Sequence, residues 1–141
     1  MMRFMMITKE RKQADPDAMP DARGAATMMK YMESLAKAGV LLAFDGLRSA
    51  AMGTQVSFPE GKPVVTDGPF PEAKEVIGGY WMIQVNSKEE AIEWAMRCPA
   101  FPDFAIEIRQ VLEFSEFPAE VQAAAAIYPR LKAQCRNRPG T

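Results

Sequence analysis

The chain has 141 residues, 48% of them hydrophobic and 25% charged, so it can bury one core without disulfides or a metal. Its 17 basic and 18 acidic residues give a net charge of −1, which argues against a nucleic-acid-binding surface. There is no histidine and no paired-cysteine motif, so we expect no metal and no cofactor. Two unpaired thiols and the lack of a membrane-spanning apolar run predict a cytoplasmic protein without membrane contact.

The first half of the chain predicts a strand, a helix, a second strand and a hairpin. Residues 3–8 form a short apolar run that is typical of a buried strand. Apolar residues then recur at helical spacing, and Gly39 is placed to end that helix. The helical positions are Met28, Tyr31, Met32 and Leu35. Residues 40–44 predict the next strand, and residues 54–58 and 62–66 alternate on either side of a glycine turn, which indicates a hairpin.

The second half predicts a strand, a helix, a last strand and a C-terminal helix. Residues 80–85 are apolar at nearly every position, which predicts a strand covered on both faces. A capping box opens a helix over residues 87–98, and a proline stops it. Residues 104–109 alternate and predict a half-buried strand. Residues 118–128 predict a helix that Pro129 ends or kinks.

Without the hairpin, the elements follow the order βαββαβ, which is the ferredoxin-like unit, so we predict an α+β fold with an inserted hairpin. The expected boundaries are a domain over residues 1–117 and a C-terminal helical extension and tail over residues 118–141. The helices of this unit cover only one face of the sheet. A second copy of the chain would cover the other, so we predict a homodimer, with Ile83 on the face turned toward the partner.

Residues 65–80 read VTDGPFPEAKEVIGGY and hold more special backbone positions than a simple connection requires. Asp67 is the candidate catalytic residue, because a carboxylate at a pocket mouth can act as an acid or a base; the alternative is an ordinary turn aspartate. The expected ligand-binding residues are Gly68, Pro69, Phe70, Gly78, Gly79, Tyr80 and Arg48. Gly78 and Gly79 fit either backbone N–H groups that line a pocket or a β-bulge.

Six segments, in this order and at this spacing, resemble the YCII-related proteins of the DGPF type. They are RFMMI (3–7), LAKAGVLL (35–42), VTDGPF (65–70), KEVIGGY (74–80), EWAMRCP (93–99) and IEIR (106–109). The resemblance spans residues 2–112. It implies a dimeric α+β barrel of two ferredoxin-like sheets, usually bacterial, whose activity is not established. Better-studied relatives have a His-Asp pair proposed as catalytic, and this chain, without histidine, keeps only Asp67.

Hypotheses of different classes fit these residues. In the first, the protein binds a small organic molecule in an apolar pocket edged by residues 65–80, with metal-free acid–base chemistry as a further step. In the second, it is a non-catalytic regulatory module, which the resemblance links to an extracytoplasmic-function sigma factor. A purely structural dimer is the third. The residues do not decide between an enzyme and a binding protein.

Overall fold

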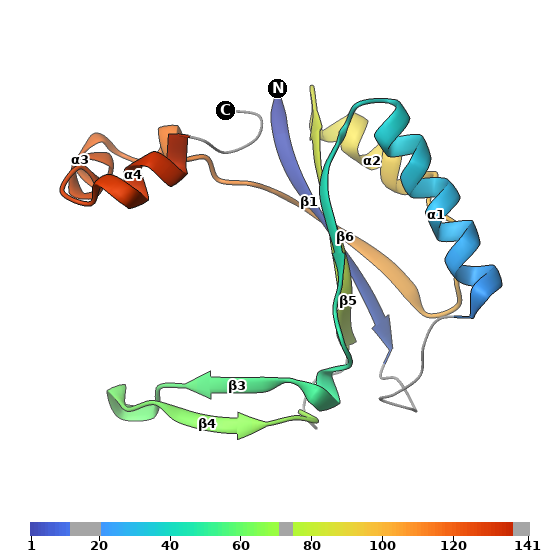
Figure 1. The fold of residues 1–141 in the computed structure, drawn as a ribbon, viewed down its shortest axis with the longest axis horizontal. Helices are drawn as coiled ribbons and strands as arrows, with labels where there is room; N and C mark the ends of the chain where they lie inside the picture. The colour runs from blue at the N-terminus through green and yellow to red at the C-terminus, as the bar shows by residue number, and fades with distance from the viewer. Residues whose placement is uncertain (12–20, 71–74, 137–141) are drawn as a thin grey trace.

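The structure is a computed structural model that describes residues 1–11, 21–70 and 75–136. At its centre is a four-stranded sheet in the order β2-β5-β1-β6, in which every pair of neighbours is antiparallel (Figure 1). The strands are β1 (Met2–Arg11), β2 (Leu41–Gly46), β5 (Glu75–Val85) and β6 (Phe104–Gln110). The predicted α+β fold class is confirmed.

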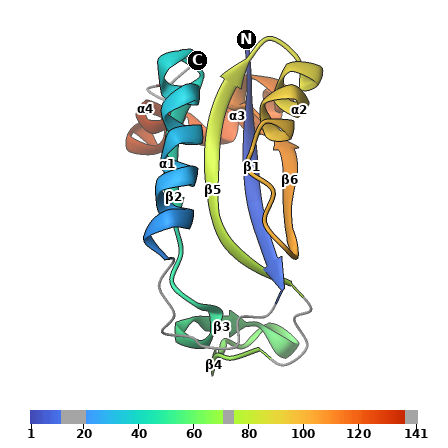
Figure 2. The same ribbon diagram turned by 90° about the vertical axis from the view of Figure 1, so that its right-hand side faces the viewer.

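Two helices, α1 (Ala22–Lys37) and α2 (Lys88–Met96), cover one face of this sheet (Figures 1 and 2). The carboxylate of Asp21 caps α1 by accepting a hydrogen bond of 2.7 Å from the backbone N–H of Gly24. Beyond the other end of α1, Gly39 has φ 75°, the left-handed conformation that the sequence predicts there. Ser87 caps α2 by accepting a bond of 3.1 Å from the N–H of Glu90.

The core lies between these helices and the sheet. Alternation along β1 and β5 turns five apolar side chains toward the helices, and all are less than 5% exposed. They are Phe4, Met6, Trp81, Ile83 and Val85. The ring of Trp81 packs edge-on against Tyr31 of α1, with 5.5 Å between the centroids. Placing Ile83 on the dimer face is therefore wrong, because it is fully buried beneath the helices of its own protomer.

The opposite face of the sheet, called the open face below, carries the alternate residues. At its centre are Met5, Ile7, Tyr80 and Met82, all partly exposed. Ion pairs lie at its margins: Lys9 of β1 contacts Glu107 of β6 at 3.2 Å, and the nearly buried Arg3 donates two hydrogen bonds of 2.6 and 2.8 Å to Glu113, which follows β6. None of the helices described here covers this face (Figure 1).

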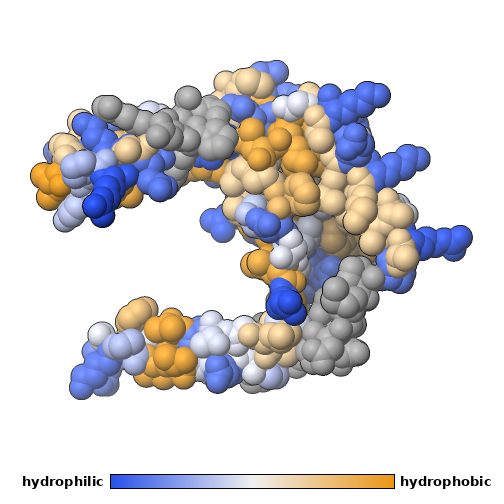
Figure 3. All heavy atoms as spheres, viewed as in Figure 1, coloured by the Kyte–Doolittle hydropathy of each residue, from blue (hydrophilic) through white to orange (hydrophobic). Residues whose placement is uncertain are grey.

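Two projections extend from the sheet on the side of the open face, one at each end (Figures 1 and 2). The hairpin arm consists of β3 (Thr54–Ser57) and β4 (Val64–Asp67). The helical arm consists of α3 (Ala119–Ala125) and α4 (Pro129–Arg136), so Pro129 divides the predicted C-terminal helix into two. Short 3₁₀ turns lie at η1 (Ala50–Met52), η2 (Pro59–Gly61) and η3 (Phe114–Glu116). The arms give the protomer a hollowed, C-shaped outline (Figure 3).

Removal of the helical arm should leave a folded core. The last strand of the sheet ends at Gln110, and Arg3 pairs with Glu113 before the arm begins. Among the side chains of the helical arm that the structure describes, only Ala125 is buried. We therefore expect a chain that ends at Phe117 to keep the far-ultraviolet circular dichroism of an α+β domain and a cooperative thermal transition. An unfolded or insoluble truncated chain would show that the arm belongs to the core.

Candidate functional site

A cleft of about 730 Å³ lies beside the N-terminal half of α1, on the side of the sheet that the helices cover. Five parts of the chain line it: the end of β1, the first turns of α1, the end of β2, the start of β5 and the segment before β6. Its volume falls within the roughly 300–1,000 Å³ that is typical of small-molecule sites. The cleft is therefore our candidate binding site.

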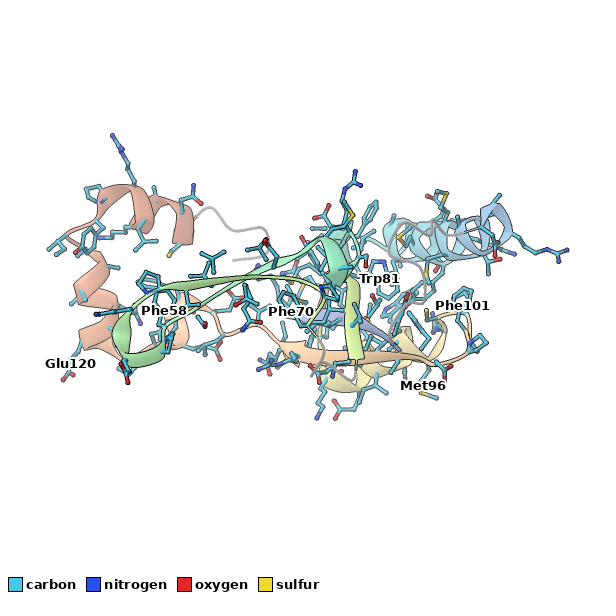
Figure 4. All side chains as sticks on the ribbon, turned by 90° about the horizontal axis from the view of Figure 1, so that it is seen from below. Phe58, Phe70, Trp81, Met96, Phe101 and Glu120 are labelled. Carbon is cyan, nitrogen blue, oxygen red and sulfur yellow. The ribbon has the colours of Figure 1, made fainter. Side chains whose placement is uncertain are left out.

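Methionine and aromatic side chains make up most of the apolar wall of the cleft. They are Met28, Met29, Met32, Phe44, Trp81, Phe101 and Phe104. Figure 4 shows Trp81 and Phe101 on the side of the sheet where α1 lies. The rings of Phe101 and Phe104 meet edge to face, with 5.7 Å between their centroids. Unbranched methionine side chains adapt to irregular shapes, so this wall suits an apolar molecule without demanding one outline.

The polar part of the cleft is acidic. Among the described lining residues, every charged residue is acidic: Glu10, Asp21, Asp45 and Asp103. Asp45 differs from the other three, because it pairs with Tyr80 and both side chains project toward the open face; there its carboxylate accepts a hydrogen bond of 2.7 Å from the phenol, which raises the pKa of Tyr80 above its usual value. Carboxylates accept hydrogen bonds and attract positive charge. The cleft therefore suits an apolar molecule that also carries N–H or O–H donors or a cationic group.

A β-bulge brings Gly78 and Gly79 to the cleft. The β1–β5 ladder pairs Thr8 with Gly79 and Lys9 with Ile77, which leaves Gly78 as the extra residue. The hydroxyl of Thr8 donates a bond of 3.2 Å to the carbonyl of Gly79. A Cβ at Gly79 would lie 2.5 Å from the carbonyl oxygen of Asp45, so β2 approaches β5 this closely only beside a glycine. The bulge alternative is confirmed, and both glycines also line the cleft.

The Asp67–Phe70 segment lies elsewhere, at the base of the hairpin arm (Figure 4). Asp67 is exposed and accepts a hydrogen bond of 3.0 Å from the hydroxyl of Thr54. The N–H of Gly68 donates to the carbonyl of Gly53 at 2.8 Å, and the peptide bond between Gly68 and Pro69 is cis. Pro69 is exposed and Phe70 is half-buried. None of these four residues lines the cleft.

The structure thus divides the residues that the sequence grouped into one site. Gly78, Gly79 and Tyr80 line the cleft, whereas the Asp67–Phe70 segment and the exposed Arg48 do not. Residues 71–74, which join the two groups, lie outside the described part of the chain. Sequence reasoning missed the four acidic residues that line the cleft. Only Asp21 carries a local signal, as a capping residue before a helix, because the others meet there only through the fold.

Other reactive groups do not add to this site. Burial raises the pKa of the Cys98 thiol to about 11, so less of it is in the reactive thiolate form at neutral pH than in an exposed cysteine. Within residues 1–11, 21–70 and 75–136, no three His, Cys, Asp or Glu side chains group in a way that could hold a metal ion. In the same ranges, no helix has both the length and the apolar character needed to cross a membrane.

Gly68 should prove necessary for the fold of the hairpin base. A Cβ there would lie 2.1 Å from the carbonyl oxygen of Ala50, whereas a Cβ at Gly46 would meet nothing within 4 Å. Forcing an atom into such packed space costs roughly 1–3 kcal/mol. We expect Gly68→Ala to lower the urea-measured free energy of unfolding by about 2 kcal/mol. Gly46→Ala serves as the control, and equal losses in both variants would contradict the packing described at Gly68.

Comparison with known proteins assigns the chain to a family. No curated protein matches the chain. A family model described as YCII-related domain matches residues 2–115, which include the whole sheet, both covering helices, the hairpin arm and the glycine bulge. The helical arm lies beyond the matched part. The match confirms the resemblance seen in the sequence: the chain belongs to the YCII-related family.

Proposed function

We propose that this protein binds a small organic molecule in the cleft beside α1. The observation that supports this function is the combination of an adaptable apolar wall with carboxylates in one cavity of about 730 Å³. Apolar contacts would supply most of the binding free energy, and the carboxylates would fix the orientation of donor or cationic groups on the ligand. Of the 65–80 segment that the hypothesis places at the pocket, residues 78–80 line this cleft and residues 67–70 do not.

Acid–base chemistry, if the bound molecule is a substrate, would fall to the carboxylates of the cleft. Glu10 and Asp103 both line it, and Asp103 has φ 57°, an uncommon backbone conformation for a residue other than glycine. Asp67 stays a prediction as a catalytic residue, and its position at the hairpin base separates that role from the cleft. Binding is therefore the function that the geometry supports best.

Filling the cleft should abolish binding. Ala25, in the first turns of α1, lines the cleft, whereas the next residue, Ala26, is exposed and does not. We expect Ala25→Trp to remove the saturable, ligand-dependent rise in melting temperature that a screen of small amines and aromatic compounds reveals in the unaltered protein. Ala26→Trp makes the same change one position away and should keep that response.

Two outcomes would count against this cleft. If both tryptophan variants respond to the same compounds as the unaltered protein, the ligand binds elsewhere. If no compound in a broad screen changes the melting temperature of the unaltered protein, the cleft is not a small-molecule site for the classes tested.

We also propose that two copies pair through their open faces, as a dimeric α+β barrel of ferredoxin-like sheets. The strand order β2-β5-β1-β6 and the two helices on one side support this arrangement. So do the partly exposed Met5, Ile7 and Met82 at the centre of a face that no described helix covers. Burial of such a face stabilises association at about 25 cal/mol per Å² before the entropic cost of association is subtracted.

A charge on the open face should separate the protomers without unfolding them. Met82 and Ile83 are neighbours on opposite faces of β5. We expect Met82→Glu to give a folded monomer by light scattering and circular dichroism. Ile83→Glu should instead unfold the protomer, because it places a carboxylate in the core. If Met82→Glu stays dimeric, the open face is not the interface.

The regulatory alternative uses the same surface. A protomer that is folded but monomeric would leave its open face and arms for a different protein, and the sigma factor suggested by the family resemblance would be the first partner to test. The dimer requires only the chain itself, so it is the simpler explanation for the uncovered surface.

A further inference from the structure

We propose that the helical arm of each protomer packs against the hairpin arm of its partner. This inference rests on the homodimer proposed above, and it concerns the contacts beyond the two open faces. The helical arm lies outside the part of the chain that matches the family. The contact would therefore be specific to chains that carry this extension.

Neither arm is expected to be stable in isolation. The hairpin arm has two strands of four residues, and a lone two-stranded hairpin is at best marginally stable in water. The helices of the other arm have seven and eight residues, below the roughly 12–15 at which an isolated helix begins to form. Both arms therefore need packing from outside themselves.

Both arms expose large apolar side chains that could provide this packing. Eight such side chains are between 44% and 74% exposed. They are Val56, Phe58, Val64 and Val65 on the hairpin arm with the adjoining turn, and Val121, Ile127, Tyr128 and Leu131 on the helical arm with its connection. Apolar side chains gathered in this way on the surface are typical of a protein–protein contact. Figure 3 shows apolar surface on both arms.

The arms of one protomer do not cover each other. They extend from opposite ends of the sheet in both ribbon views, with the hollow in front of the open face between them (Figures 1, 2 and 3). A second copy seated against the open face lies in that hollow and brings two more arms of its own. The partner's arms are therefore the surfaces best placed to cover these side chains.

Symmetry allows two ways of matching the arms. If the two-fold axis runs across the strands, it exchanges the two ends of the sheet, so each helical arm meets the partner's hairpin arm. If the axis runs along the strands, the two helical arms meet each other, and so do the two hairpin arms. Residues 119–136 hold three basic residues and one acidic, whereas residues 54–67 hold two acidic and one basic. The first arrangement pairs opposite net charges, and the second pairs equal ones, so charge favours the first.

Alternation in the hairpin selects the face that would bind the partner's helices. Val56 and Val65 pair directly across the two strands, and Thr54 pairs with Asp67 two residues further along the same face. A helical arm packed on the two valines would thus lie beside Asp67. The Asp67–Phe70 segment, which does not line the cleft, would then form the base of this contact between the two protomers.

Cysteine cross-linking tests this contact in the full-length chain. In a Cys135→Ser background, which leaves only the poorly reactive Cys98, we would combine Val65→Cys with Leu131→Cys and add a short bis-maleimide at neutral pH. We expect the double variant to form a covalent dimer and each single variant to stay largely uncross-linked. A control variant carries Thr66→Cys, on the other face of the hairpin, in place of Val65→Cys. It should give much less covalent dimer.

The other outcomes separate this inference from the dimer itself. Cross-linking by both single variants would mean that like arms meet, and it would overturn the contact. So would equal products from the Val65 and Thr66 pairs, or a dimer by light scattering in which the double variant gives no covalent product. A folded monomer by light scattering would overturn both the contact and the homodimer. A second readout needs no cross-linker: Val65→Glu should raise the dimer dissociation constant about tenfold, and Thr66→Glu should not.

Discussion

An antiparallel sheet has two faces, and the helices of this chain cover only one of them. Most features of the protomer follow from this constraint. The face beneath α1 and α2 holds the core, with Trp81 packed on Tyr31. The open face has an apolar centre and ion-paired margins, and two arms project past it with apolar side chains exposed. A surface of this kind is what an interface with a second copy would require.

The cleft depends on the same sheet through a local irregularity. The bulge at Gly78 interrupts the β1–β5 ladder near the ends of these strands, and Gly79 lets β2 pass close to β5. The start of β5 thereby meets the first turns of α1 and the segment before β6 around a shared cavity. A bulge at Gly78 and a position at Gly79 that only glycine tolerates thus shape the site, while side chains from separate elements supply its chemistry.

The fold was largely predictable from the sequence, because its signals are local. Period-two alternation, helical spacing, the Ser87 cap and Gly39 each act within a few residues, and the structure places strands, helices and the hairpin accordingly. The direction of Ile83 was not predictable, because residues 80–85 are apolar on both faces and the pattern gives no preference. Asp45 and Gly46 look like a turn, but they belong to β2, where they pair with Tyr80 and Gly79.

The site was predictable only in part, for a related reason. A dense cluster of special residues marked 65–80 as one unit, yet its first part supports the hairpin and its last part lines the cleft. The Gly68 position is explained by close packing against Ala50, which no sequence pattern reveals. Glu10, Asp45 and Asp103 converge from distant positions through tertiary structure, so their neighbourhood becomes visible only in three dimensions.

The central claim is that a second copy fills the hollow in front of the open face. Small-angle X-ray scattering of the unaltered protein tests this most directly, because it reports mass and shape together. The account predicts a compact particle with twice the 15.7 kDa mass of one chain, in which the hollow is occupied. A particle of 15.7 kDa at micromolar concentration, with scattering that fits the C-shaped protomer, would contradict it.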